Sequence, residues 1–186
     1  HPLALEWLRQ CPYVVCCDGA ANTYIRSGRM PEAIVGDGDS LLPDIKERYA
    51  SLIHSEAEQE TNDLSKAFRF CLSQERKRIT IMGATGKRED HTIGNVSLLA
   101  DYMEQAEVSM MTDYGIFVPI REDSMFESYI GQQISVFNMN STALSAEGLA
   151  YPLSVFTNWW QGTLNEALAR HFIIRTEGKV LVFRVF

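Results

Sequence analysis

Basic residues are scarce in this sequence. Lys and Arg number 17 against 24 Asp and Glu, which gives a formal net charge of −7 over 186 residues. Nucleic-acid-binding surfaces need clustered basic side chains to displace phosphate counterions, so the composition argues against a nucleic-acid partner. An acidic protein can still bind an anionic nucleotide where a metal ion and local cations intervene.

Cysteines are few, and their spacing is not that of a metal site. The four residues, Cys11, Cys16, Cys17 and Cys71, include no C-x-x-C pair, which argues against a zinc knuckle. Cys16 and Cys17 are adjacent in an apolar run and would point to opposite faces of a strand. We expect reduced thiols that serve as small core residues.

Long apolar runs are missing as well. No run approaches the length of a membrane span, and no signal peptide opens the chain. We therefore expect a soluble cytoplasmic protein without a membrane partner. The chain starts at His1 rather than Met, so a preceding N-terminal piece is left open. Hydrophobic residues make up 46%, which is enough for a packed core.

Short apolar runs alternate with helix-like stretches over the first two thirds of the chain. This alternation predicts an α/β fold with a mostly parallel sheet flanked by helices. The stretch 90–105 has the clearest helical pattern. We expect strands at residues 13–17, 33–35, 51–54, 78–82 and 108–111, and helices at 2–10, 20–26, from 43, 61–74 and 90–105.

The pattern changes after about residue 120, where no convincing long helix remains. Residues 132–137 alternate, 150–153 form a short run, and 171–175 are expected to pair with 180–183 around a tight turn at Glu177-Gly178. This tail predicts a small antiparallel β unit that packs on a neighbour. We expect domains at 1–121 and 122–186.

Acidic residues follow the predicted strands. Asp18 follows the first strand, Asp37 and Asp39 follow the second, and Asp63 and Asp90 open helices after the third and fourth. Ligands of open α/β sheets bind beyond the carboxyl ends of the strands, so these acids would crowd one rim. Such carboxylates repel unless a cation neutralises them, and Mg²⁺ with substrate phosphates is the natural candidate.

A glycine-containing loop at residues 83–91 joins a predicted strand to a helix. It is not a P-loop, because only two residues separate its glycines and Arg88 follows Lys87. Both cations could still meet phosphates at the helix N-terminus. Asp90 could be a helix N-cap, a site residue or both. His91 has no second histidine at ligand spacing, which favours a structural or indirect role.

These motifs together resemble the thiamine pyrophosphokinase family. They occur in the family's order and span almost the whole chain, and each is weak alone. The matching stretches are CDGAAN (17–22), IVGDGDS (34–40), QETNDLSKA (59–67), GATGKREDHTIGN (83–95), EGLAYPL (147–153) and GTLNE (162–166). The family usually has an aromatic at Gly38, Thr at Asn62, Gly at Lys87 and Ser at Leu164, and it begins with a strand before the first helix.

The resemblance implies an N-terminal α/β domain that binds ATP and Mg²⁺ and a smaller C-terminal antiparallel β-sandwich that helps hold thiamine. It also implies a homodimer with shared active sites. In the implied reaction the thiamine hydroxyl attacks the β-phosphorus of ATP and AMP leaves.

The resemblance assigns roles residue by residue. Asp37, Asp39 and Asp63 would bind Mg²⁺, and Asp90 and Arg88 would join them in catalysis. The expected substrate-binding residues are Asp18, Asn22, Gln59, Asn62, Lys66, Lys87, His91, Asn95, Tyr151, Asn165 and Glu166. Tyr151 and the Trp159-Trp160 pair are either core residues or an aromatic face for a cationic ring.

Two alternative functions fit the same residues. The rim of acids would suit a magnesium-dependent phosphohydrolase that transfers the group to water. The second alternative is a non-catalytic module that binds nucleotide or thiamine. It stays open because Asn62 and Leu164 occupy positions where the family has hydroxyl side chains.

Overall fold

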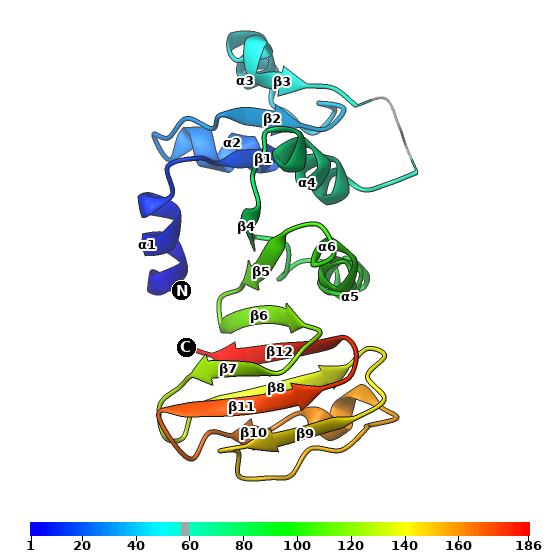
Figure 1. The fold of residues 1–186 in the computed structure, drawn as a ribbon. Helices are drawn as coiled ribbons and strands as arrows, with labels where there is room; N and C mark the ends of the chain where they lie inside the picture. The colour runs from blue at the N-terminus through cyan, green and yellow to red at the C-terminus, as the bar shows by residue number, and fades with distance from the viewer. Residues whose placement is uncertain (57–59) are drawn as a thin grey trace. The chain divides into compact units, whose positions relative to one another are not determined.

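The protein is an α/β chain, and its computed structural model is described for residues 1–56 and 60–186 (Figure 1). The chain divides into two compact units, Leu5–Ile79 and the combination of His1–Ala4 with Thr80–Phe186. Helix α1, Pro2–Gln10, crosses the first boundary, and strand β4, Arg78–Met82, crosses the second. No helix in the described residues is both long and apolar enough to cross a bilayer.

The first unit is built on a three-stranded parallel sheet. Strand β2, Ala33–Val35, lies between β1, Val15–Cys17, and β3, Ile53–His54. The helices of this unit are α2, Ala20–Arg26, α3, Pro43–Arg48, α4, Asp63–Ser73, and a 3₁₀ turn at Ala50–Leu52. The alternation of strands and helices was therefore predicted correctly.

Side-chain alternation gives this sheet two apolar faces. Cys16 and Ile34 pack with residues of α2 and α3, whereas Cys17, Ala33 and Val35 pack with residues of α4. The period of two along a strand produces this division, as predicted for the adjacent cysteines. Both faces are covered by helices, so the strands are apolar throughout rather than alternating with polar residues.

Burial makes the cysteines in this sheet poor nucleophiles. It raises the pKa of Cys16 to about 11 and that of Cys17 to about 12, with nearby Asp63 as a further cause for Cys17. Burial also raises the pKa of Cys71, while Cys11 is exposed.

We expect Ellman's reagent at neutral pH to modify one thiol rapidly in the native protein and all four after unfolding. Cys11→Ser should remove the fast phase, and rapid modification of two or more thiols would contradict this.

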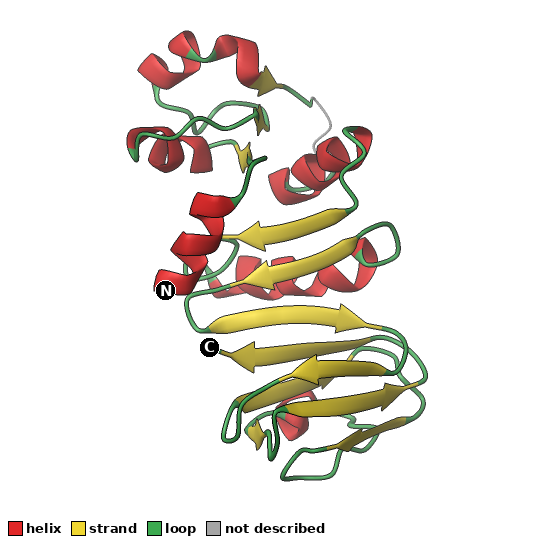
Figure 2. Ribbon diagram, turned by 60° about the vertical axis from the view of Figure 1, so that its left-hand side comes forward, coloured by secondary structure: helices red, strands yellow, loops and turns green. Residues whose placement is uncertain are grey.

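The second unit contains two sheets. The larger has the strand order β10-β8-β12-β6-β5-β4 and the smaller β7-β11-β9. Figure 2 shows strands of this unit in two layers. Besides β4, the strands are β5, Glu107–Met111; β6, Gly115–Ile120; β7, Ser124–Glu127; β8, Gln133–Asn138; β9, Leu144–Glu147; β10, Asn165–Glu166; β11, His171–Thr176; and β12, Val180–Val185.

One core holds the two sheets together. Val136 of β8 and Val182 of β12 meet Phe126 of β7 and Phe172 of β11 in a single buried cluster. The rings of Phe126 and Phe172 stack with centroids 5.2 Å apart. The tail therefore buries a substantial apolar core between its two sheets.

The predicted hairpin between residues 171–175 and 180–183 is wrong. Strand β11 pairs with β7 and β9, whereas β12 pairs with β6 and β8. Both strands bury side chains in the core between the sheets, so the chain crosses from one sheet to the other at the turn. Gly178 has a φ of +133°, and a Cβ there would lie 2.7 Å from the Cα of Ser141. The predicted tight turn at Glu177-Gly178 is present, but it connects β11 in the smaller sheet to β12 in the larger sheet.

The predicted single helix at 90–105 is two short helices. Helix α5, Glu89–Ser97, and helix α6, Leu99–Tyr102, are separated at Leu98. The Ser97 hydroxyl donates to the carbonyl of Gly94 at 2.7 Å, where the backbone N–H of Leu98 also bonds at 3.2 Å. Competition of this kind bends helices, and Gly94 weakens the helix further.

The short run at 150–153 forms no strand. Its backbone is held by bonds outside a regular ladder, such as that from the N–H of Ala150 to the carbonyl of Glu166. Strands β6, β7, β9 and β10 were not predicted. The only helical segment described beyond residue 121 is a 3₁₀ turn at Trp159–Gly162.

Candidate active site

Three carboxylates meet at the carboxyl ends of β1 and β2. Asp18 follows β1, and Asp37 and Asp39 lie in the loop after β2. One oxygen from each lies within 4.8 Å of the others, a grouping that could hold a metal ion. Parallel strands deliver their carboxyl ends to the same edge, so residues about 20 positions apart in sequence come together.

The loop after β2 is organised by its own polar groups. The carboxylate of Asp37 accepts a bond from the N–H of Asp39 at 3.2 Å, and the Ser40 hydroxyl donates to Asp39 at 3.0 Å. Lys46 of α3 donates to the carbonyl of Gly38 at 2.7 Å. These bonds fix the two exposed carboxylates relative to the sheet.

Asn22 joins α2 to the same loop. Its side-chain amide donates to the carbonyl of Ser40 at 2.8 Å, and its carbonyl oxygen accepts from the N–H of Leu42 at 3.0 Å. The structure thus places Asn22, an expected substrate-binding residue, where it braces the acidic loop. Ser40 and Lys46 were not predicted as site residues; the Ser in the string GDGDS was the available signal for the first.

The acids of the group differ in their titration. Burial raises the pKa of Asp18, the bonds from Ser40 oppose this rise, and the charges of Asp63 and Asp37 add to it. Hydrogen bonds from the Ser40 hydroxyl and with Asp37 lower the pKa of Asp39. Mutual repulsion among these groups is what a bound cation would relieve.

Asp63 stands beside the group but is paired. A Cβ built on Gly36 would lie 3.4 Å from its carboxyl carbon, so its side chain reaches the same loop. Lys66 donates to Asp63 at 3.3 Å from one helical turn away. Asn62 caps α4 by accepting from the N–H of Ser65 at 2.9 Å, so the residue that replaces the family's Thr has a structural role.

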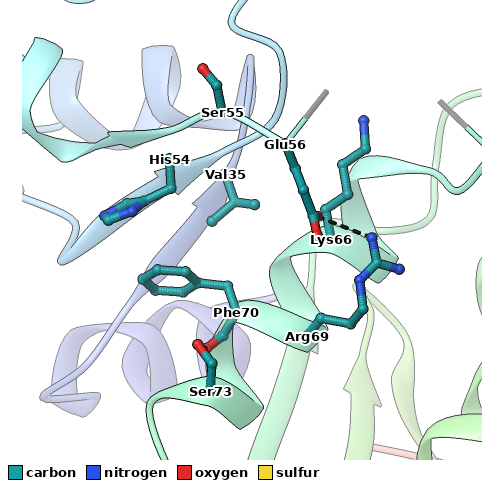
Figure 3. Close-up of a pocket in the computed structure, with 8 residues that line it drawn as sticks. All are labelled: Val35, His54, Ser55, Glu56, Lys66, Arg69, Phe70 and Ser73. Carbon is teal, nitrogen blue, oxygen red and sulfur yellow. Dashed lines mark hydrogen bonds and ion pairs between the residues drawn. The ribbon is translucent and has the colours of Figure 1, made fainter. Parts of the chain in front are cut away.

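A pocket of about 300 Å³ opens between β3 and α4 (Figure 3). His54 and Phe70 form one side of it with ring centroids 4.6 Å apart, and Lys66 and Arg69 lie on another. Arg69 is paired with Glu56 at 3.0 Å, while Lys66 is only 5% exposed. The pocket therefore combines an aromatic wall with a buried cation next to Asp63.

The glycine-containing loop belongs to the second unit. The Arg88 guanidinium donates to both carboxylate oxygens of Asp90, at 3.1 and 2.6 Å, and this contact lowers the pKa of Asp90. The Asn95 amide donates to the carbonyl of Ala84 at 2.8 Å and so ties the loop to α5. Lys87 and His91 are exposed.

Of the tail residues expected at the thiamine site, one is buried and holds the backbone of another, and the rest have exposed side chains. Asn165 is buried, and its amide bonds to both the N–H and the carbonyl of Tyr151, at 3.1 and 2.8 Å. This leaves the Tyr151 side chain 64% exposed. Glu166 is also exposed, as are Trp159 and Trp160. These aromatics are not core residues.

The predicted site residues thus occupy three places in the chain. Asp18, Asp37 and Asp39 form one group with Asp63 beside it, whereas Arg88 is the N-cap residue of α5 and Asp90 lies in the first turn of that helix. The tail residues are near β10. Gln59 lies outside the described residues.

The acidic group suits Mg²⁺ in its chemistry. Its donors are carboxylate oxygens, the hard ligands that Mg²⁺ prefers. Among the described residues, Oδ1 of Asp18 is a buried oxygen without a hydrogen-bond partner. A buried carboxylate oxygen normally has a partner, and a cation in this group would provide one.

Fold and site together define an α/β protein with a candidate cation site at the ends of parallel strands. Two family profiles cover nearly all of it: "Thiamin pyrophosphokinase, catalytic domain" matches residues 4–111, and "Thiamin pyrophosphokinase, substrate-binding domain" matches residues 115–183. The chain belongs to the thiamin pyrophosphokinase family.

Curated relatives agree with this assignment. Thiamine pyrophosphokinase 1 of Oryza sativa subsp. japonica is 30% identical over 129 residues, covering 56% of this chain and 49% of the relative. Thiamine pyrophosphokinase 2 of Arabidopsis thaliana is 31% identical over 124 residues, covering 53% and 46%. The chain spans about half the length of these relatives.

Solved structures share the fold. Thiamine pyrophosphokinase from Bacillus subtilis superposes with a TM-score of 0.80 at 21% identity, covering 93% of this chain and 87% of that one. The yeast thiamin pyrophosphokinase gives a TM-score of 0.78 at 15% identity, covering 100% and 82%. At these identities the likeness concerns the fold alone.

Proposed function

We propose that the protein transfers a pyrophosphoryl group from ATP to the hydroxyl of thiamine and releases AMP. The observation that carries this proposal is the group of Asp18, Asp37 and Asp39 within the part of the chain that matches the family's catalytic domain. Catalysts of phosphoryl transfer work mainly by positioning and by neutralising charge, and a carboxylate–metal site serves both.

The reaction assigns tasks to the chain's own residues. Asp37 and Asp39 hold the cation, which, when bound, neutralises phosphate charge. Lys66 and Arg88 are cations suited to phosphate oxygens. The thiamine oxygen bonds to the β-phosphorus, the bond from that phosphorus to the oxygen that it shares with the α-phosphorus breaks, and AMP departs with that oxygen. The hydroxyl proton passes to a carboxylate or to water.

A coupled assay for AMP on the purified protein tests this function. With ATP and Mg²⁺ present, AMP release should require thiamine, and thiamine diphosphate should form in equal amount. AMP release without thiamine would identify a phosphohydrolase. Binding of ATP or thiamine in calorimetry, with no turnover, would identify a binding module.

The proposal also assigns the two substrates to different domains of the chain. Residues 1–121 would form the α/β domain for ATP and Mg²⁺, and 122–186 an antiparallel β-sandwich that helps hold thiamine. The bounds of the two family profiles, 4–111 and 115–183, and the exposed aromatic side chains near β10 support this division, whereas the compact units divide at residues 79 and 80. A cytoplasmic location would suit a user of ATP with reduced thiols.

Arg88 provides a prediction about ATP. The Arg88 guanidinium donates hydrogen bonds to both carboxylate oxygens of Asp90, and the same bidentate geometry suits phosphate oxygens equally well. We expect Arg88→Lys to lower kcat/KM for ATP about tenfold or more, because the lysine ammonium loses the bidentate contact. Steady-state kinetics at saturating thiamine measure this, with Arg170→Lys in the tail as the control. Unchanged kinetics in Arg88→Ala would reduce Arg88 to surface charge.

We further propose a homodimer in which the tail of one subunit completes the thiamine site of the other. The Tyr151 side chain projects into solvent while Asn165 holds its backbone by hydrogen bonds. An exposed aromatic ring on a fixed backbone is well placed to contact a ligand or a partner subunit. The positively charged ring of thiamine suits an aromatic face.

Mixing two impaired variants tests the shared site. Asp39→Asn chains and Tyr151→Ala chains should each be impaired, yet hybrid dimers would contain one wild-type site. We expect the mixture to recover part of the lost activity, measured as AMP release after subunit exchange. Complete exchange without recovery would mean that each site is built within one chain.

A further inference from the structure

Helix α5 is poorly anchored for its length. None of its nine residues, all of which the structure describes, is buried, and Ile93 at its centre is 58% exposed. The next helix, α6, has only four residues, yet its Leu99 and Tyr102 are buried. Elements with few buried apolar contacts open most readily, so α5 should move more easily than α6.

An apolar pocket of about 120 Å³ is lined by α5 and by the larger sheet. Phe137 and Leu181 line it on the side of the sheet away from the core, because they alternate along their strands with the core residues Val136 and Val182. An apolar cavity of roughly 150 Å³ can hold a benzene-sized group, so this pocket is large enough for one aliphatic side chain.

The face of α5 that lines the pocket carries two aliphatic side chains, Ile93 and Val96. Its two hydroxyl groups are bonded to carbonyls one turn earlier in the same helix, that of Thr92 at 3.1 Å and that of Ser97 at 2.7 Å. This face of the helix is therefore apolar, and it packs only partly against the sheet. Close packing is the normal state of such surfaces, and a small movement of the helix would achieve it.

Both ends of the segment 84–97 allow it to move. Gly83, directly after β4, has a φ of +70°, and no atom among the described neighbours lies within 4 Å of a Cβ built on it. At the other end the helix is interrupted at Leu98. The bond from the Asn95 amide to the carbonyl of Ala84 makes the loop and α5 move together. Hinges of moving segments are usually a few loop or element-terminal positions of this kind.

Helix α6 is held by charges as well as by burial. Glu104, just after α6, is paired through one oxygen with Lys179 at 2.8 Å and through the other with Arg121 at 2.6 Å. Lys179 also donates to the carbonyl of Ala100 at 2.7 Å, a favourable contact for a cation near a helix C-terminus. Helix α6 thus provides a fixed support about which α5 can turn.

We propose that residues 84–97 form a lid that hinges at Gly83 and Leu98 and, in its closed position, packs Ile93 into the apolar pocket. The lid carries Arg88 and Asp90, so its motion controls when the arginine can engage phosphate and when product can leave. This role in turnover rests on the proposed function, but the motion itself can be measured without turnover.

Methyl relaxation dispersion on the wild-type chain, with labelled isoleucine δ1 methyl groups, tests the motion without any ligand. The rings of Phe117 and Phe137, with centroids 6.3 Å apart, both line the pocket, so closing should shift the Ile93 methyl signal upfield. We expect exchange on the microsecond-to-millisecond timescale at Ile93, with an upfield-shifted minor state. Ile130, a more exposed isoleucine in the loop after β7, is the control and should show none. Absence of exchange at Ile93, or equal exchange at both residues, would overturn the proposal.

A disulfide trap tests the closed position. Ile93→Cys and Met139→Cys place two thiols in the pocket lining, on a Cys11→Ser background that removes the exposed native thiol. Diamide should cross-link this pair, as shown by peptide mass spectrometry. The control pair, Gly94→Cys with Met139→Cys, should not cross-link, because a Cβ on Gly94 points into open space among the described residues. Equal cross-linking of both pairs, or of neither in folded protein, would overturn the closed position.

Locking the lid should also stop turnover. We expect oxidation of the Ile93→Cys/Met139→Cys protein to lower thiamine-dependent AMP release at least about tenfold, and dithiothreitol to restore it, because a fixed lid blocks exchange of substrate and product. Circular dichroism before and after oxidation establishes that the fold is kept. Full turnover of the cross-linked protein would overturn the lid's role. The methyl experiment needs no substitution and stands if this pair does not fold.

Failure of this inference and failure of the proposed function are distinguishable. Thiamine-dependent AMP release in a chain whose Ile93 methyl shows no exchange would remove the lid and leave the function. Exchange at Ile93 and selective cross-linking to position 139, in a protein without that turnover, would leave the moving segment and remove the function.

Discussion

Asp39→Asn should lower kcat at least about a hundredfold while the fold remains intact. The change keeps the size of the side chain and removes a charge from the group formed with Asp18 and Asp37. An amide can accept the bond from the Ser40 hydroxyl, so the loop after β2 keeps its local structure. A hundredfold loss corresponds to about 2.7 kcal/mol of transition-state stabilisation, a reasonable value for one metal ligand.

Steady-state kinetics at several magnesium concentrations measure this effect. Asp44→Asn is the matched control, because it removes one exposed negative charge from the same unit without touching the group. It should retain nearly full activity. Near-normal turnover of Asp39→Asn at ordinary magnesium would remove Asp39 from the site, and equal losses in both variants would indicate an effect of net charge only.

Gly36→Ala should also reduce kcat/KM by about a hundredfold, through displacement of the acids. A Cβ at this position would lie 2.8 Å from the Cβ of Asp18 and 3.4 Å from the carboxyl group of Asp63. Neither β1 nor α4 can retreat without disturbing the buried packing around Val35 and Ala67. The carboxylates must therefore move, and a small displacement of catalytic groups has large effects on rate.

Gly28→Ala provides the comparison for Gly36→Ala. Both glycines have positive φ, +84° at Gly28 and +150° at Gly36, but no atom lies within 4 Å of a Cβ built on Gly28 among the described neighbours. Backbone strain should lower stability by about 1–2 kcal/mol in Gly28→Ala with little change in kcat/KM. Thermal melts and kinetics separate the two effects. If both variants keep wild-type kinetics, the close contact at Gly36 does not position the site.

The site of the first unit was largely predictable from sequence because its chemistry is local. In a parallel sheet the residue after each strand lies at the same edge, so the strings CDG and GDGDS are enough to bring Asp18, Asp37 and Asp39 together. The burial of Asp18 was not predictable. It depends on the Ser40 N–H and on Gly36 packing against it, which are contacts of tertiary structure.

The tail was less predictable because its pairing is not local. Apolar alternation identified the residues of β11 and β12, but alternation does not specify a partner strand. The two strands contribute to one core from opposite layers, an arrangement that a sequence pattern cannot distinguish from a hairpin. The bonds by which Asn22 and Asn165 hold nearby loops likewise depend on backbone groups distant in sequence.

The position of β12 has a consequence for how the chain folds during synthesis. This strand is the last described in sequence, yet it lies between β6 and β8 and supplies hydrogen bonds to both. Until it has been made, β6 and β8 present open edges, and the core between the layers lacks Val180 and Val182. Joining β12 to β6 closes a loop of roughly sixty residues, a slow step of high contact order. The Leu5–Ile79 unit has its own core and can fold first, so the nascent second unit is the part most exposed to aggregation.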